Sequence, residues 1–287
     1  MVAYAFLERL QKKRLLVKTR KRGMHKGSRR SSAFGSSLEF SDFRAYQPGD
    51  DVRQIDWNVF GRTQKHYIKR FLDEQELSVA VYLDMSSSMR ALPGKWEQAR
   101  KLAASLSFVV LASEDRLNFV PVGNQGAHPI RRKGAVHRKR VFREIAGLED
   151  TERSGEFYEQ LGKVMVRNQQ LAIIISDGLE PIEKVEATLR KLRSARQEVW
   201  FIQLLGKEEL QPMYDGDLKF VDSEMETAVN VSLNPTLIDN YRRSLAHHNE
   251  QLEAICESLG SRYMLISAEK DIQTILFHDF PRHGLMN

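Results

Sequence analysis

The sequence predicts an α/β protein built on a mostly parallel sheet with helices on both faces. Two short apolar runs, 79–83 and 171–175, have the length and the β-branched content of strands buried inside such a sheet. From residue 79 onward, runs of this kind alternate with segments of helical periodicity. Strands that alternate with helices favour parallel pairing through right-handed crossovers.

The chain before residue 79 has a different pattern. Residues 4–16 carry apolar side chains at helical spacing, and the glycines and serines that follow predict a loop over 31–37. Pro48-Gly49 is typical of a type II turn, because proline presets φ and glycine accepts the positive φ that follows. Residues 66–71 alternate in polarity like an edge strand that leads toward the sheet.

The remaining elements of the predicted sheet domain follow in order. Strands are expected at 116–122, 198–205 and 262–266, and residues 128–132 are expected to form a hairpin with the first of them. Residues 208–234 break the alternation and are expected to form a β-hairpin insertion. Helices are expected, from one apolar face each, at 95–113, 136–145, 157–166, 181–196, 236–259 and 270–277.

Composition excludes several classes of protein. With 41% hydrophobic and 29% charged residues over 287 positions, the chain has the balance of an ordinary globular protein. Cys256 is the only cysteine, which excludes an internal disulfide and a cysteine metal site, and its apolar helical neighbours favour a buried thiol. The apolar runs are too short for a signal peptide or a membrane span, so we expect a cytoplasmic protein.

Positive charge is concentrated near the N-terminus. Residues 1–38 hold eleven lysines and arginines against Glu8 alone, whereas the whole chain carries +6, so the remainder is slightly acidic. Through residues 9–30 such a tract can attach to nucleic acid or to an anionic membrane, or it can be a solvated arm that aids solubility. The candidate anion-binding residues are Lys12, Lys13, Arg14, Lys18, Arg20, Lys21 and Arg22.

Residues 38–71 interleave opposite charges with aromatic side chains. Asp50 and Asp51 stand where they can cap a short helix after the Pro48-Gly49 turn. We interpret the stretch as a structural, partly buried ion-pair network packed against the sheet, in preference to a second metal cluster of aspartates. Its members are Arg44, Tyr46, Pro48, Gly49, Asp50, Asp51, Arg53, Asp56, Trp57 and Arg62.

Two of the predicted strands end in polar side chains. Asp84 begins an Asp-x-Ser-x-Ser motif with Ser86 and Ser88, and Asp177 follows the run 171–175. The carboxyl ends of parallel strands share one edge of a sheet, where α/β folds bind ligands. One carboxylate and two hydroxyls suit Mg²⁺ or Mn²⁺, whereas the alternative is that the serines only cap the next helix.

These motifs together carry a family resemblance. The residues concerned are Phe34-Gly35, Glu39-Phe40, Arg44-x-Tyr46, Pro48-Gly49-Asp50-Asp51-x-Arg53-x-Ile55-Asp56-Trp57, Arg62-Thr63, Phe71 and Leu83-Asp84-x-Ser86-x-Ser88-Met89. They resemble a bacterial family of domains of unknown function, the one numbered fifty-eight, whose downstream half is similar to a von Willebrand factor A domain. The resemblance implies a Rossmann-like sheet with a metal-ion-dependent adhesion site, and a MoxR-type AAA+ ATPase as partner.

The resemblance also implies which residues hold the ion. In the adhesion-site pattern the Asp-x-Ser-x-Ser side chains line it, a threonine from a separate loop adds a ligand, and the second aspartate, here Asp177, acts directly or through water. Gly155 stands where that threonine is expected. Thr151 or Ser154 is therefore the expected substitute, and the alternative is a degenerate site that keeps the fold without holding the ion. The implied domains are a basic N-terminal segment over 1–33, the signature segment over 34–78 and the A-like domain over 79–287.

Together these observations predict a non-enzymatic protein-binding module that assists the ATPase in protein maturation or complex assembly. The alternatives are a metal-dependent hydrolase, or nucleic-acid or anionic-membrane binding through the basic N-terminus. An aspartyl-phosphate phosphatase needs a second carboxylate where Ser86 stands, and a serine hydrolase needs a Gly-x-Ser-x-Gly elbow that is missing. No Gly-Lys-Ser/Thr phosphate loop occurs in the sequence, so ATP hydrolysis would belong to the partner.

Overall fold

The computed structural model describes residues 4–18, 26–123, 128–149, 156–212, 216–221, 228–233 and 235–287. Its contacts divide the chain into two units, Met1–Arg20 with Ser78–Asn287, and Lys21–Leu77. The sequence suggested a first boundary at residue 33. The structure instead groups the N-terminal helix with the sheet domain, because Phe6 and Leu10 of that helix are buried.

A six-stranded sheet forms the centre of the first unit, in the order β10-β7-β6-β3-β4-β5. Only β5 runs antiparallel to its neighbour within this sheet, which confirms the predicted mostly parallel architecture. The central strands are buried on both faces, as their continuous apolar sequences predict. The strands are β3 (Ser78–Asp84), β4 (Arg116–Val122), β5 (Ile130–Lys133), β6 (Leu171–Ser176), β7 (Glu198–Leu205) and β10 (Arg262–Ser267).

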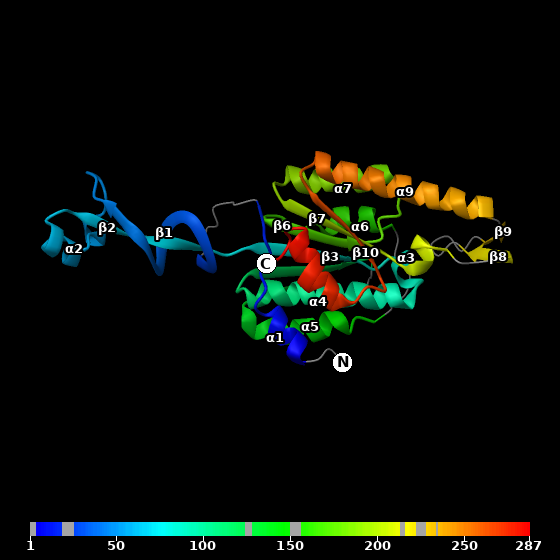
Figure 1. Ribbon diagram of the computed structural model, residues 1–287, viewed down its shortest axis with the longest axis horizontal. Coiled ribbons are helices and arrows are strands. Elements are labelled where there is room, and N and C mark those ends of the chain that lie inside the picture. The colour runs from blue at the N-terminus through cyan, green and yellow to red at the C-terminus, as the bar shows by residue number, and fades with distance from the viewer. Residues whose placement is uncertain are drawn as a thin grey trace. The chain divides into compact units, whose positions relative to one another are not determined.

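Helices cover both faces of this sheet (Figure 1). On one face α4 packs with α5 and α1, and on the other α7 packs with α6 and α9. None of the described helices is long and apolar enough to span a membrane. The helices are α1 (Tyr4–Leu10), α3 (Ser87–Arg90), α4 (Pro93–Ala112), α5 (Arg138–Ala146), α6 (Phe157–Val164), α7 (Ile182–Ser194), α8 (Lys207–Leu210), α9 (Pro235–Ser258), α10 (Ile272–Thr274) and α11 (Phe280–Arg282), with a π-helical turn over Ile275–Asp279.

The core beneath α6, α7 and α9 shows how the sheet is held. Tyr82 of β3 is fully buried, and its hydroxyl accepts a hydrogen bond from the Val166 backbone N at 3.0 Å. Cys256 of α9 lies in the same cluster, which confirms the expected buried thiol. Burial raises the pKa of that thiol to about 12, so Cys256 acts as a small apolar side chain.

Most of the predicted elements of the sheet domain are present, with ends that differ by a few residues. The insertion is a hairpin of β8 (Gly216–Val221) and β9 (Ala228–Leu233), as expected. The helix expected over 4–16 is shorter than predicted, because α1 ends at Leu10. Beyond it Leu15 forms a β-bridge with Met286, so this part of the chain is held in an extended form.

The second unit is built on an antiparallel pair, β1 (Lys26–Ala45) and β2 (Tyr67–Gln75), with α2 (Trp57–Thr63) between them. The expectation of a loop over 31–37 was wrong, because these residues lie within β1, where Phe34 and Gly35 pair with β2 between two irregularities of register. The turn at Pro48-Gly49 is present, and Gly49 has φ of +103°. Positive φ at this position is what a type II turn requires.

The signature residues of this unit form ion pairs that lie mostly at its surface. Arg44 pairs with Asp50 at 2.7 Å, and Arg53 pairs with Asp51 at 2.8 Å. Asp56 is buried, caps the start of α2 and pairs with Lys69 at 3.0 Å. The network is therefore buried only around Asp56, because Arg53 and the other cations reach into solvent. Its predicted packing against the sheet remains a prediction.

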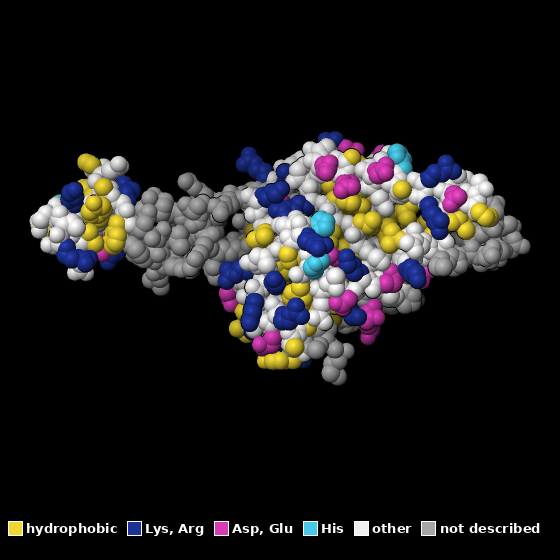
Figure 2. All heavy atoms as spheres, in the orientation of Figure 1, with side chains coloured by type: hydrophobic (Ala, Val, Ile, Leu, Met, Phe, Trp, Pro, Cys, Tyr) yellow, Lys and Arg dark blue, Asp and Glu magenta, His cyan; other side chains and the backbone are white. Residues whose placement is uncertain are grey.

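Hydrophobic side chains are also exposed on this unit. Figure 2 shows them in yellow on its described surface, and Phe43, Val52 and Trp57 are exposed at 42%, 56% and 61%. Phe60 stacks on His66 with ring centroids 4.5 Å apart, and Trp57 meets both rings edge-on. Trp57 is thus a surface residue.

Candidate cation-binding site

The two predicted aspartates come together at the carboxyl edge of the sheet. Asp84 ends β3, and Asp177 directly follows β6, the strand that pairs with β3 in parallel. Both side chains are buried, Asp84 with 1% and Asp177 with 3% of its surface exposed. The convergence predicted from two separate strand ends is therefore present in the structure.

Asp84 is held by short hydrogen bonds from two sides. Its Oδ1 accepts from the Ser86 backbone N at 2.8 Å, and its Oδ2 accepts from Ser176 Oγ at 2.6 Å. Burial and the nearby charge of Asp177 nevertheless raise the pKa of Asp84 to about 7. The two hydrogen bonds therefore do not fully compensate an ionised carboxylate at this position.

The two serines of the motif face each other beside Asp84. Ser86 Oγ and Ser88 Oγ are hydrogen-bonded to each other at 3.0 Å. Ser86 stands at the N-cap of α3, but in the described structure its side chain makes no capping hydrogen bond to that helix. Capping by Ser86 would require a hydrogen bond from a backbone N–H of α3 to its hydroxyl. Because that bond is missing, the structure does not support the alternative that Ser86 is a helix cap.

The donor set fits a small divalent cation. Neighbouring oxygen ligands of an octahedral Mg²⁺ at about 2.1 Å stand about 3 Å apart, which matches the separation of the two serine oxygens. A carboxylate has about four lone-pair sites, of which Asp84 uses two in the described hydrogen bonds. Within the described residues no three His, Cys, Asp or Glu side chains gather around a metal position, so the hydroxyls are essential to this site.

A buried lysine that was not predicted from the sequence also lies at the carboxyl edge of the sheet. The Nζ atom of Lys95 on α4 lies 2.9 Å from Asp177 Oδ2 and 2.7 Å from Glu209 Oε1, and its side chain is fully buried. Burial acts to lower the pKa of Lys95, but the charges of Asp177 and Glu209 outweigh it and raise the pKa. Lys95 is therefore a permanent cation inside the site.

Glu209 links this cluster to the segment that precedes the hairpin insertion. It lies on α8, and its Oε2 accepts a hydrogen bond from the Gly206 backbone N at 2.7 Å. Burial raises the pKa of Glu209, whereas the charge of Lys95 acts to lower it. Asp177 and Glu209 thus share the Lys95 ammonium group, whereas the described contacts of Asp84 are to the Ser86 backbone and the Ser176 hydroxyl.

The structure does not place every residue that was predicted for the site. Thr151 and Ser154 lie outside the described residues, so their role as substitute ligands remains a prediction. Ser176, Lys95 and Glu209 were missed. Ser176 could have been noticed because it directly precedes Asp177, but neither Lys95 nor Glu209 belongs to a motif, and only the fold brings them to this edge.

The basic N-terminal segment is partly held on the first unit. The guanidinium of Arg9 lies 4.2 Å from the centroid of the Phe277 ring, and the backbone N of Lys18 donates to Glu198 at 2.6 Å. Lys12, Arg14 and Lys18 expose their side chains, and Lys13 is half-buried. Arg20, Lys21 and Arg22 lie outside the described residues. Residues 4–18 are thus part of a folded unit.

The sheet and the edge site together define the class of protein. A mostly parallel sheet with one antiparallel edge strand carries an Asp-x-Ser-x-Ser motif after a central strand, and a second aspartate follows the neighbouring strand. This is a von Willebrand factor A-like α/β domain. The family described as "Protein of unknown function DUF58" matches residues 42–251, and the chain belongs to it.

Curated proteins and solved structures of low identity are similar to this chain. The uncharacterized proteins Mb1516 of Mycobacterium bovis and Rv1480 of Mycobacterium tuberculosis are each 28% identical over 267 residues, covering 90% of this chain and 83% of their own length. Among solved structures, BatB of Bacteroides thetaiotaomicron is 12% identical with a TM-score of 0.40, over 72% of this chain and 98% of its own. A manganese-loaded TRAP protein of Plasmodium vivax is 12% identical with a TM-score of 0.35, over 70% and 72%.

Proposed function

We propose that this chain is a non-enzymatic protein-binding module that holds Mg²⁺ or Mn²⁺ at Asp84, Ser86 and Ser88. The observation that carries the proposal is the 3.0 Å separation of the two serine oxygens beside a buried carboxylate with incompletely compensated charge. When bound, the ion supplies a position that accepts a carboxylate oxygen from a partner protein. Binding of this kind requires no covalent step.

The chain's own residues favour such an acceptor site. Lys95 pairs with Asp177 and Glu209, so these two carboxylates have a counter-charge before any ion binds. Asp84 is then the main uncompensated carboxylate next to the serine hydroxyls. One carboxylate does not neutralise a divalent ion, and the remaining positive charge favours an anionic ligand from outside.

The proposed partner is a MoxR-type AAA+ ATPase, which the family resemblance implies, with protein maturation or complex assembly as the shared task. The cytoplasmic location expected from the sequence is compatible with that partner. A hydrolase is less well supported, because the position two residues after Asp84 is the hydroxyl of Ser86, where a phosphatase needs a second carboxylate.

Calorimetric titration with Mg²⁺ and with Mn²⁺ tests the site. The variant Ser86→Ala/Ser88→Ala removes both hydroxyl ligands, and Ser87→Ala is the matched control between them. We expect saturable binding to wild type and to the control, and a loss of affinity of about tenfold or more in the double variant. Equal binding by all three proteins, or none by wild type, would contradict the proposed ligands.

The partner is tested separately with a purified MoxR-type ATPase from the same genome. We expect the ATPase to bind both wild type and Ser87→Ala in the presence of the divalent ion. A chelator should abolish binding to both proteins. Binding that persists unchanged in Ser86→Ala/Ser88→Ala would mean that the contact uses another surface.

A further inference from the structure

A cavity of about 570 Å³ opens at the edge of the sheet opposite to Asp84 and Asp177. It lies where β3 and β4 begin, where β5 ends, and beside the turn before β6. Five cationic side chains line it, and among the described lining residues there is no Asp or Glu: the cations are Arg116, Arg131, Arg132, Lys133 and Arg167.

The fold brings these cations together from three separate segments. In the antiparallel pair of β4 and β5, Arg116 lies opposite Lys133, and Asn118 lies opposite Arg131. Arg167 comes from the turn that leads into β6. The fold thus gathers positive charge from two neighbouring strands and a turn at one end of the sheet.

Buried amides fix the wall of the cavity. The Asn118 side chain donates to Gln169 Oε1 at 2.9 Å, and Gln169 Nε2 donates to the Arg167 carbonyl oxygen at 2.9 Å. Both amide side chains are buried, with 6% and 5% of the residue exposed. The backbone that carries Arg167 is therefore tied to the strand that carries Arg116.

Protection of an edge strand does not account for the whole cluster. Lysines and arginines on an outer strand such as β5 prevent pairing with other chains, and that explains Arg131, Arg132 and Lys133. It does not explain Arg167, which comes from the turn before β6, across β3 and β4 from the outer strand.

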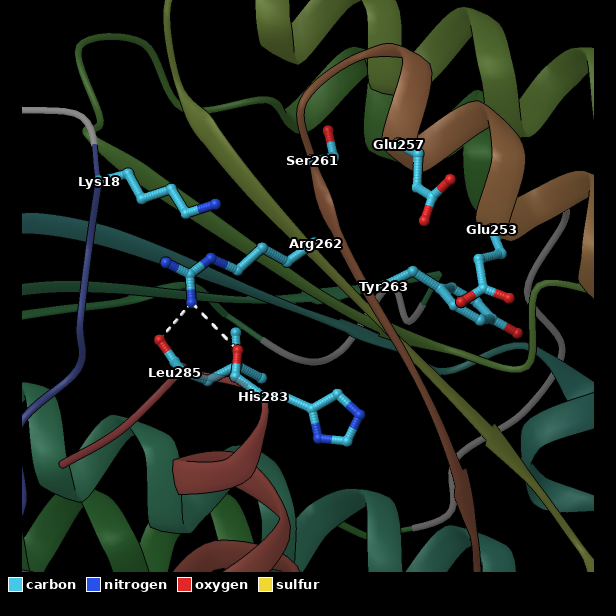
Figure 3. A pocket seen from close by; sticks show the side chains of 9 residues that line it. Lys18, Glu253, Glu257, Ser261, Arg262, Tyr263, His283 and Leu285 are labelled. Carbon is cyan, nitrogen blue, oxygen red and sulfur yellow. Dashed lines mark hydrogen bonds between the residues drawn. The ribbon is translucent and has the colours of Figure 1, made fainter.

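A second cavity, of about 330 Å³, shows what a mixed lining looks like (Figure 3). Lys18 and Arg262 line it together with Glu253 and Glu257 of α9. Arg262 already donates to the carbonyl oxygens of His283 and Gly284 and pairs with Glu198. That cavity carries both signs of charge, so it has no selectivity for an anion.

We propose that the basic cavity binds a small ligand that carries two or more phosphate groups, either free or as a lipid headgroup. Guanidinium groups bind phosphate oxygens through two parallel hydrogen bonds, and four of the five cations are arginines. The volume lies within the range of small-ligand sites. This site is independent of the cation-binding edge.

Calorimetry with inorganic tripolyphosphate at low ionic strength tests the proposal. Arg131→Gln/Arg167→Gln removes one cation from each side of the cavity, and Arg242→Gln/Arg243→Gln on α9 removes the same charge at an exposed site elsewhere. We expect saturable binding to wild type, weakened about tenfold or more in the cavity variant and less than about twofold in the control. Equal weakening in both variants, or no saturable binding to wild type, would overturn the site.

Flotation with phosphatidylcholine vesicles, with and without phosphatidylinositol bisphosphate, distinguishes the two sources of phosphate. Recruitment only to the phosphorylated vesicles, lost in the cavity variant, assigns a lipid headgroup. Binding of tripolyphosphate without recruitment assigns a free ligand. Recruitment that the cavity variant retains, together with unchanged tripolyphosphate binding, would show that the cavity is not the anion site.

Discussion

Among single residues, Lys95 supplies the buried positive charge of the candidate cation site. Its ammonium group is fully buried between Asp177 and Glu209, and it also lies 3.3 Å from the Ser88 carbonyl oxygen. A buried charge is stable only when paired, and here each charge compensates the other. The lysine therefore holds α4, the end of β6 and α8 together at this edge.

Replacement of Lys95 by methionine is expected to destabilise the fold strongly. Lys95→Met leaves the buried Asp177 and Glu209 without their cation, so we expect a loss of about 3–5 kcal/mol in the free energy of unfolding, measured in urea. Lys101→Met on the same helix is the control. Lys101 forms a surface pair with Glu97, for which we expect less than about 0.5 kcal/mol. Similar losses in the two variants would refute the role of Lys95.

Asp84 makes the stability of the cation-free protein depend on pH. Its pKa is raised from 3.8 to about 7, so between these values the folded protein keeps a proton that the unfolded chain has released. The proton therefore stabilises the folded state at acidic pH. As the pH rises toward about 7 this contribution is lost, and the free energy of unfolding falls by a few kcal/mol at most. Urea unfolding with a chelator at about pH 5 and about pH 7.5 measures the change.

Asp84→Asn carries no charge and should lose that part of the pH dependence, whereas Asp239→Asn at an exposed position should keep it. Mg²⁺ should flatten the wild-type profile, because a bound cation disfavours the protonated carboxyl. Parallel pH profiles for wild type and Asp84→Asn would show that another group is responsible.

At the scale of elements, the N-terminal segment is more than a carrier of charge. Phe6 of α1 meets Phe277 edge-on at 5.8 Å, and Leu15 bridges to Met286 near the other end of the chain. Deleting residues 1–30 would therefore remove core side chains together with the basic tract. Substitution of the exposed Lys12 and Arg14 is the cleaner test of anion binding by this segment.

Two adjacent leucines test this packing. Leu15 is fully buried and Leu16 is 41% exposed, although they have the same chemistry and neighbouring positions. We expect Leu15→Ala to lower the free energy of unfolding by about 2–4 kcal/mol and Leu16→Ala by less than about 0.5 kcal/mol, measured by thermal or urea unfolding. Equal small effects would mean that the segment is not part of the cooperative unit.

For the whole molecule, the sequence was most informative where pattern and position coincide. Asp84 and Asp177 could be placed at one edge because each directly follows an apolar strand, and parallel strands end on the same side. Cys256 and the hairpin β8–β9 could likewise be predicted from local pattern alone. These features can be predicted locally because the spacing of apolar residues along the chain reflects which side chains are buried.

The parts that the sequence did not reveal depend on contacts between distant segments. Lys95 and Glu209 are 114 residues apart, and nothing in either local sequence marks them as partners. The basic cavity combines residues from β4, β5 and the turn before β6.

The two proposed sites should act independently, because they lie at opposite edges of one sheet. β3 reaches from the basic cavity to Asp84 with seven residues, a length of roughly 20 Å, which is about twice the Debye length at physiological salt. We therefore expect Arg131→Gln/Arg167→Gln to leave the affinity for Mn²⁺ within about twofold of wild type. Conversely, Ser86→Ala/Ser88→Ala should leave tripolyphosphate binding unchanged, both by calorimetry. A shift of about tenfold in either cross-experiment would show that the sheet transmits binding from one edge to the other.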